Sequence, residues 1–471
     1  MLGDAGAPDT DRVIDPRPPE FSDDALASRF TAYHAGQLRY TEVWRRWSRW
    51  DGSRWRDDKT LAVFDLARAI CRAAAAEAKL IGGTRSAALA AALASAKTVA
   101  AVERLARADR RHATHAEAWD ADPWLLNTPG GTVDLRTGAI HSNNPDDLIT
   151  KITSVAPSDL VPTTWLRVLR RVTAGNEEMV AFLQRIMGYA LTGSIREHAM
   201  FFFYGTGGNG KSLVLNTVSS ILGDYATTAP METFAQSTGD RHPTELAHLR
   251  SARLVTAQET EEGRRWAEAR IKSLTGGDTI AARYMGRDFF TFAPQFKLLI
   301  AGNQKPGLRN VDEAIRRRFN LIPFSETITP EERDPDLAEK LRVEWPGILS
   351  WMIQGSIEWQ REGLRAPTIV TSATERYLSD QDFLGAWLAE SCELRSGAQE
   401  RSSVLFSSWK SWAERNGVSP GTNMRLTEQL ESRGFGRVRT NSGAVFRGLS
   451  VLTITVNDAQ SKARSGESDG L

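Results

Sequence analysis

The segment from Gly205 to Ser212 reads GTGGNGKS, and its residue types and spacing define a chemistry by themselves. The pattern G-x-x-x-x-G-K-[ST] is typical of a phosphate-binding loop, in which glycines let successive backbone N–H groups face phosphate oxygens. A glycine-rich turn with an exposed lysine is the plain alternative. We predict an ATP–Mg²⁺ site, with Lys211 on the β- and γ-phosphates and Ser212 on the metal. The predicted nucleotide contacts are Gly205, Thr206, Gly207, Gly208, Asn209, Gly210, Lys211, Ser212 and Leu213.

An acidic residue on a neighbouring strand is the second requirement of such a site, to hold Mg²⁺ and polarise the attacking water. The apolar run RLVTA, beginning at Arg253, ends in Gln258-Glu259, with Glu261 and Glu262 close behind. We predict Glu259 as the catalytic acid and as a metal ligand beside Ser212. Acids also suit the first turn of a helix. That interpretation is preferred for Glu261 and Glu262 and stays open for Glu259.

Two further polar elements follow at the spacing that an ATPase needs. The run KLLIAGNQKP ends a predicted buried strand in Asn303, which can orient the attacking water, although asparagine is also a common turn residue. The run DEAIRRRF, from Asp312 to Phe319, holds three successive arginines. Arg317 and Arg318 are both candidates for an arginine that neutralises transition-state charge in a neighbouring subunit, or for a solvated face.

These residues need a scaffold, and the surrounding sequence predicts one. Short apolar runs at 200–204, 253–257 and 297–301 are typical of buried parallel strands, and 212–222 is predicted to be a helix. Alternation of strands and helices indicates a doubly wound parallel sheet. Helices are predicted at about 61–81, 86–108 and 165–195, and Pro129-Gly130-Gly131 predicts a turn between two short strands.

Composition sets outer limits on function. The chain has 471 residues and a formal net charge of +1, so nucleic-acid binding would need local patches. Its only cysteines, Cys71 and Cys392, form no CxxC pair, which argues against a zinc ribbon or a disulfide scaffold. The alanine-rich stretch 87–102 indicates a packed helix and not a membrane span. We expect a soluble cytoplasmic protein without a membrane partner.

The order and spacing of these four elements resemble the phage and plasmid primase–helicases with a poxvirus-type helicase module, a branch of the superfamily III helicases within the AAA+ class. The most specific segment is IKSLTGGDTIAARYMGRDFFTFAPQFKLLIAGNQKP, which includes Lys272, Arg283, Phe289 and Phe292. Arg316 stands where the family pattern has an aromatic residue, and Gln258 stands where related members often have an acid. No separate primase domain is found.

The resemblance implies how the chain would meet DNA. Residues 278–292 are predicted to form a β-hairpin with its tip at 286–288, which in related helicases enters the channel of a homo-hexameric ring. Lys272, Arg283 and Arg287 would then contact phosphates, and Tyr284 would stack on a base. An ordinary strand pair with solvated arginines is the alternative. The implied partners are single-stranded DNA, forked duplex DNA and a primase supplied by another polypeptide.

The same resemblance suggests the domain organisation. We expect a multidomain α/β protein with a central P-loop AAA+ parallel sheet flanked by helices. The predicted parts are a disordered tail (1–20), a mainly α helicase-associated N-terminal domain (21–151), the ATPase domain (152–372), a winged-helix-like domain (373–457) and a second disordered tail (458–471). The C-terminal unit could serve as a duplex-binding or as a protein-binding module, and the sequence favours neither. The tryptophan–arginine stretch 44–56 is either core with surface arginines, the preferred interpretation, or a DNA contact.

Two functions remain at this stage. The first is an ATP-dependent DNA helicase of phage or plasmid replication, active in the cytoplasm of a bacterial host. The second is a nucleotide-controlled origin-binding or loading protein without processive unwinding.

Overall fold

A five-stranded parallel sheet forms the centre of the computed structural model, which describes residues 17–236, 244–258, 265–285, 288–308, 311–440 and 443–452. Its strands are β7 (Met200–Tyr204), β8 (Ala226–Thr228), β9 (Leu254–Gln258), β12 (Lys297–Gly302) and β13 (Phe319–Pro323). Their spatial order is β13-β7-β12-β9-β8. The first strand in sequence, β7, therefore lies between β12 and β13, which are the last two in sequence. The three predicted buried strands are confirmed within one residue at each end.

The sequence of β7 shows why this sheet is covered on both faces. Phe201 and Phe203 point into one hydrophobic cluster, whereas Met200 and Phe202 point into another. All four side chains are fully buried. Because successive side chains in a strand alternate between faces, a wholly apolar run of this kind needs helices on both sides.

Two groups of helices provide that cover. On one face lie α5 (Thr163–Val172), α6 (Glu177–Leu191), α7 (Lys211–Leu222) and α11 (Leu337–Glu362). On the other lie α8 (Thr244–Ala247), α9 (Glu268–Gly276), α10 (Glu313–Arg316) and α12 (Thr368–Asp380). The predicted helix 165–195 is two helices, because the chain turns at Gly175 (φ +74°) and Asn176 caps α6.

The N-terminal part contains α1 (Asp23–His34), α2 (Ala62–Ile81), α3 (Ser86–Leu93) and α4 (Ala96–Ala108), with an antiparallel sheet of β1 (Leu38–Thr41), β2 (Arg46–Trp50) and β3 (Trp55–Asp57). The prediction of one helix over 86–108 is wrong. The chain bends by 55° between α3 and α4, where the Ser95 hydroxyl accepts a hydrogen bond from the Thr98 amide and starts a new helix. A second antiparallel sheet follows, formed by β4 (Leu125–Thr128), β5 (Gly131–Asp134) and β6 (Ala139–His141), and it confirms the predicted turn.

The C-terminal part has its own core around Trp387, Leu405 and Leu430. It consists of α13 (Phe383–Ser391), β14 (Cys392–Arg401), α14 (Ser402–Arg415), α15 (Asn423–Ser432), β15 (Arg437–Thr440) and β16 (Gly443–Val451). The helices α14 and α15 are followed by the hairpin of β15 and β16, and β14 adds a third strand to it. Assignment of this unit as a winged helix stays a prediction.

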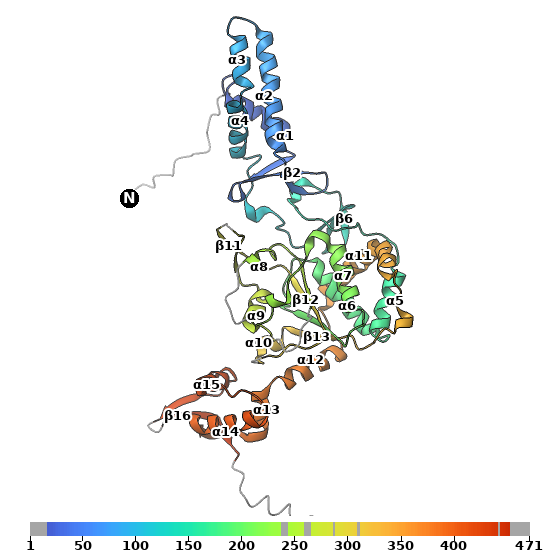
Figure 1. Ribbon diagram of the computed structural model, residues 1–471, viewed down its shortest axis with the longest axis vertical. Helices are drawn as coiled ribbons and strands as arrows, with labels where there is room; N and C mark the ends of the chain where they lie inside the picture. Colours follow the sequence, from blue (N-terminus) through green and yellow to red (C-terminus); the bar gives the residue numbers. More distant parts are fainter. Residues whose placement is uncertain are drawn as a thin grey trace, which may run out of the picture.

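The three parts follow one another along the long axis in Figure 1, with the helices α1–α4 at one end, the parallel sheet in the middle and α13–α15 at the other end. Residues 1–16 and 453–471, which hold most of the two predicted disordered tails, lie outside the described residues. Among the helices described, none alone is long and apolar enough to cross a membrane, although the bent pair α3–α4 passes that test by length and composition.

The two cysteines allow the cores at the two ends to be followed separately. Both are buried, Cys71 in the N-terminal cluster and Cys392 in the C-terminal cluster. Burial raises the pKa of the Cys71 thiol to about 11 and that of Cys392 to about 12. Since the thiolate is the reactive form, the folded chain should resist thiol reagents at pH 8.

We predict that each cysteine becomes reactive only when its own cluster unfolds. Pulse labelling with an aromatic disulfide along a denaturant series, followed by peptide mass spectrometry, should give a separate transition for each residue. Fast labelling of either cysteine in the native protein would contradict the burial described here.

Candidate functional site

The ends of three neighbouring strands define one edge of the sheet. Tyr204 at the end of β7 is paired with Gly302 at the end of β12, and Gln258 at the end of β9 is paired with Ala301. Gly205 follows β7 and Asn303 follows β12, so both residues lie at the same edge of the sheet. Carboxyl ends of parallel strands beside a change in strand order are where α/β proteins bind ligands.

The phosphate loop connects β7 to α7 at this edge. Gly210 precedes the helix with φ of +80°, a backbone conformation that residues other than glycine rarely adopt. Gly205 is needed for a different reason, because a Cβ there would lie 2.2 Å from the Phe324 carbonyl oxygen. The backbone N–H groups at the start of α7 have no partner within the helix, so this end favours an anion.

Lys211 is the centre of the site. Its ammonium group donates to the Gly205 carbonyl at 2.9 Å and to the side-chain oxygens of Asn209 and Asn303 at 3.2 Å each. Lys211 is only 6% exposed, and burial lowers the pKa of its ammonium. All of these acceptors are neutral, and no ion pair of Lys211 is found among the described residues. A phosphate group would supply the missing negative charge.

The contact between Lys211 and Asn303 brings together two residues that are 92 positions apart in the sequence. Both were predicted site residues, and the structure places them in direct contact. Asn303 is exposed, so its side chain can also meet a bound nucleotide or a water molecule.

Ser212 faces the end of β9. Its hydroxyl donates to Gln258 Oε1 at 3.4 Å, and the Gln258 amide donates to Asn216 Oδ1 at 3.3 Å. A hydroxyl and an amide oxygen are hard ligands of the kind that Mg²⁺ accepts together with phosphate oxygens. The donor set therefore fits a magnesium–nucleotide complex held by Ser212 and Gln258. Glu259, the predicted acid, lies outside the described residues.

A second wall of the site comes from the segment after β13. The Asn209 amide donates to the Glu326 carbonyl at 3.2 Å, and the Ile328 amide donates to the Gly208 carbonyl at 2.9 Å. Arg171 on α5 secures this segment through Glu332 at 2.9 Å and Glu326 at 3.2 Å. These contacts hold residues 326–332 against the phosphate loop.

Arg333 follows that wall, and no motif of the sequence singled it out. One of its guanidinium nitrogens lies 3.7 Å from the position that a Cβ at Gly208 would occupy. Its side chain is exposed and forms no ion pair with the described residues. The capping box of Thr329 and Glu332 could have predicted a local turn, but nothing in the sequence signals proximity to the phosphate loop.

The two predicted arginine fingers lie elsewhere. Arg318 immediately precedes β13, whose first residue Phe319 is paired with Met200, the first residue of β7. Arg317 and Arg318 therefore stand at the amino edge of the sheet, while the phosphate loop is at the carboxyl edge. Five residues of strand separate the two edges, roughly 16 Å at about 3.3 Å per residue.

These two arginines also differ in their contacts. Arg318 donates to Thr275 Oγ1 at 3.1 Å and to the Ala314 carbonyl at 2.8 Å, which ties it to its own subunit. The Arg317 side chain is 70% exposed, and its one polar partner among the described residues is Glu313, whose carboxylate lies at 4.0 Å. Of these two arginines, Arg317 is therefore the one whose side chain is exposed at the surface.

The side chains predicted to contact DNA that the structure describes already have partners within this chain. The expected hairpin is present as β10 (Ile280–Arg283) and β11 (Phe289–Phe292), although Gly286 and Arg287 at its tip lie outside the described residues. Arg283 covers the face of Phe289 at 5.0 Å. Tyr284 stacks on Phe290 at 5.3 Å and donates to the Ala247 carbonyl. Lys272 forms an ion pair with Asp312, so within this chain it steadies the start of α10.

Comparisons with known proteins show which families and which relatives this chain resembles. A family described as D5 N terminal like matches residues 27–174, and a family of unknown function (DUF5906) matches residues 203–318. "Putative helicase L207/L206" of Acanthamoeba polyphaga mimivirus is 25% identical over 327 residues, which cover 63% of this chain and 34% of the relative. "Putative helicase 022R" of Frog virus 3 is also 25% identical, over 64% of this chain and 32% of the relative. The chain thus spans about a third of the length of these curated relatives.

A solved structure gives a likeness of fold. The apo structure of the NrS-1 C terminal region superposes with a TM-score of 0.51 and 12% identity, over 91% of this chain and 99% of that one. At this identity the match concerns the architecture and not the chemistry.

We predict that Mg-ATP stabilises the wild-type chain and that Lys211→Ala removes this effect, because the buried ammonium is the main partner for the phosphates. A ligand at about 100 times its Kd adds roughly 2.7 kcal/mol to the free energy of unfolding. Differential scanning fluorimetry with and without Mg-ATP measures the shift. Lys340→Ala, which changes an exposed lysine near the start of α11, is the control and should keep the shift. Equal shifts in Lys211→Ala and wild type would contradict the assignment.

Proposed function

We propose that this chain is a helicase of the phage-type primase–helicase family, which hydrolyses ATP to move along single-stranded DNA. The contact between Lys211 and Asn303 is the observation that carries this proposal, since it joins a phosphate-binding lysine to a polar residue at the end of the neighbouring strand. That arrangement serves hydrolysis of a terminal phosphate, whereas a site for binding alone needs only the loop.

Each described residue has a separate task in the proposed reaction. Lys211 and the backbone N–H groups of the loop would bind the phosphates. Ser212 and Gln258 would supply oxygen ligands to Mg²⁺. The metal neutralises charge on the triphosphate when it is bound. Asn303 orients the water that attacks the terminal phosphorus, and Glu259, the predicted catalytic acid and metal ligand, would help to polarise that water.

The position of the arginines supports a ring. Arg317 stands at the edge of the sheet opposite its own phosphate loop, so it cannot reach the nucleotide bound by the same chain. It can reach a nucleotide only in a second copy. We therefore assign the finger to Arg317 and give Arg318 a positioning role on Thr275. A homo-hexamer is the assembly we propose, with single-stranded and forked DNA as partners and priming supplied by another polypeptide in the bacterial cytoplasm.

A nucleotide-controlled loader remains the second candidate. It is favoured by the C-terminal unit, whose exposed Arg425, Arg437 and Arg439 suit attachment to duplex DNA as well as to a protein. A loader would turn over slowly whatever DNA is added. Stimulation of ATP hydrolysis by single-stranded DNA therefore separates the two.

Arg317→Ala should lower kcat for ATP by about 10³-fold or more, the effect of removing an arginine finger, without weakening ATP binding. Mixing Arg317→Ala with Lys211→Ala chains should restore part of the activity. In such mixtures the first chain supplies an intact phosphate loop and the second supplies the arginine. Steady-state ATPase of the mixtures is the measurement, and a complete absence of complementation would show that Arg317 does not act between subunits.

Arg333 should act within its own chain. We predict that Arg333→Ala raises the KM for ATP several-fold and leaves kcat nearly unchanged, because an exposed guanidinium beside Gly208 binds phosphate before and after the transition state alike. Arg342→Ala on α11 is the matched exposed control. A fall in kcat at constant KM would instead place Arg333 among the groups that act only in the transition state.

A further inference from the structure

A broad groove separates the small N-terminal sheet from the hairpin of the ATPase domain, and the proposed reaction does not use it. Its volume is about 1580 Å³, larger than the roughly 300–1,000 Å³ of most small-molecule pockets. One wall is formed by residues 43–60, from η1 (Glu42–Trp44) through β2 and β3. The opposite wall is formed by Arg250, Ser251, Tyr284 and residues 288–291.

Aromatic rings line both walls, and guanidinium groups lie among them on the first wall and at Arg250 on the second. Arg250 joins the walls, with its guanidinium 5.2 Å from the ring centre of Trp44 and 5.2 Å from that of Phe290. Trp44 and Trp50 are half-buried in the first wall, and Phe289 is 62% exposed in the second. The preferred interpretation of the tryptophan–arginine stretch thus holds only for Trp47 and Trp55, which are core residues.

The acidic and basic side chains that line the groove differ in how many of them already have a partner. Most of its acids already have partners: Asp57 is paired with Arg46, Asp120 with the Thr150 hydroxyl and amide, and Asp224 with Arg54. By contrast, Arg45, Arg49 and Lys59 are exposed and have no ion-pair partner among the described residues.

Arg49 is also directly opposite Arg56 in the pairing of β2 with β3. Like charges at a cross-strand pair destabilise a sheet. The arrangement becomes favourable when an anion lies across both guanidinium groups. The Asp51 carboxylate, 3.9 Å from Arg56, offsets part of this repulsion, whereas Arg49 has no ion-pair partner among the described residues. Two exposed arginines side by side therefore suit a ligand with closely spaced negative charges.

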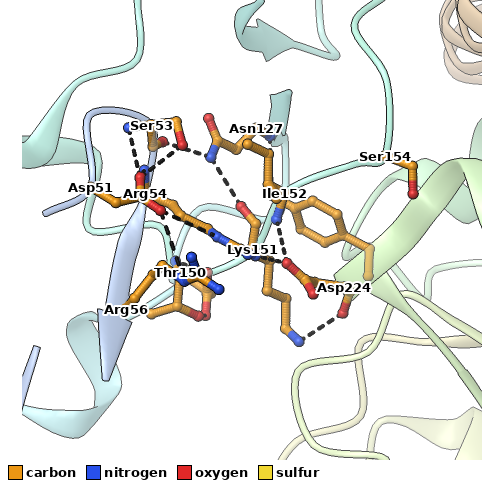
Figure 2. A network of polar contacts seen from close by, with 12 residues as sticks. Asp51, Ser53, Arg54, Arg56, Asn127, Thr150, Lys151, Ile152, Ser154 and Asp224 are labelled. Atoms are coloured by element: carbon orange, nitrogen blue, oxygen red, sulfur yellow. Dashed lines mark hydrogen bonds and ion pairs between the residues drawn. The ribbon is translucent and has the colours of Figure 1, made fainter. Parts of the chain in front are cut away.

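The floor of the groove is rigid. Figure 2 shows Arg54 paired with Asp224, which follows α7, and the Lys151 ammonium donating to the Asp224 carbonyl at 2.9 Å. Asn127 donates to the Ser53 and Lys151 carbonyls at 2.9 and 3.0 Å. These contacts fix the arginine-bearing strands to the end of the helix whose other end holds the phosphate loop.

We propose that this groove, which shares its second wall with the hairpin, binds single-stranded DNA. The proposal rests on the proposed function for its choice of DNA. Unpaired bases can stack on Trp44, Trp50 and Phe289, and phosphates can lie across Arg49 and Arg56. Duplex DNA keeps its bases stacked inside, and an acidic peptide would make no use of the aromatic rings.

The test uses the full chain without nucleotide and a labelled oligothymidine of about 20 nucleotides, longer than the roughly 4–16 that one single-strand site covers. Fluorescence anisotropy over a salt series gives the affinity and its salt dependence. Trp50→Ala should weaken binding roughly five- to 150-fold, the effect of removing one stacked base. Arg49→Ala with Arg56→Ala should weaken binding and lower the salt slope by about 0.7 for each phosphate that the variant no longer neutralises.

Stability separates a binding role from a structural one. The double variant removes both the repulsion between Arg49 and Arg56 and the exposed ion pair of Arg56 with Asp51, so its melting temperature should stay close to that of the wild type while it binds DNA less tightly. Arg72→Ala is the control, since Arg72 is an exposed arginine on α2 outside the groove. Equal affinity of the double variant and Arg72→Ala would overturn the proposal, as would a lower melting temperature that fully accounts for the weaker binding.

Further probes identify the ligand class. Photo-crosslinking of an iodouridine-substituted strand should map to peptides with Trp44 or Trp50 on the first wall, and crosslinks confined to the hairpin of β10 and β11 would overturn the proposal. Tighter binding of blunt duplex, oligouridine or polyglutamate than of oligothymidine would also overturn it. ATP hydrolysis without DNA reports on the proposed function alone. It should stay unchanged in Arg49→Ala/Arg56→Ala, so loss of either activity can be assigned to its own site.

Discussion

The buried ammonium of Lys211 is the interaction on which the rest of the site depends. It is surrounded by neutral oxygen atoms, so its charge is held in position without being neutralised by an ion pair among the described residues. Burial of an uncompensated charge opposes folding. The parallel sheet overcomes this cost with two large hydrophobic clusters on its faces, and the site is thereby preorganised for a negatively charged ligand.

The same sheet sets the relation between the other functional groups. Strand register brings the phosphate loop, Gln258 and Asn303 to the carboxyl edge and sends Arg317 to the amino edge. A single chain therefore contains both halves of the proposed catalytic centre but cannot bring them together. In the proposed ring, assembly of several copies would join the two halves and would link hydrolysis in one subunit to the position of the next.

Much of this arrangement was predictable because it is encoded locally. The phosphate loop, the strands around it and helix α7 follow from glycine spacing and from short apolar runs, which act over fewer than a dozen residues. Contacts between distant segments were harder to predict. The position of Arg333 beside Gly208 depends on how the chain returns after β13, and the bend at Ser95 depends on a cap that an alanine-rich pattern conceals. The difference between Arg317 and Arg318 also needed the structure, because Thr275, the partner of Arg318, is 43 residues away.

Strand separation on a forked DNA, measured with the wild-type chain in the presence of Mg-ATP, tests the proposed motor most directly. The account predicts unwinding that requires hydrolysable ATP, accompanied by ATP hydrolysis that single-stranded DNA accelerates. Hydrolysis that is slow and indifferent to DNA, with the fork left intact, would contradict a translocating helicase and favour the loader.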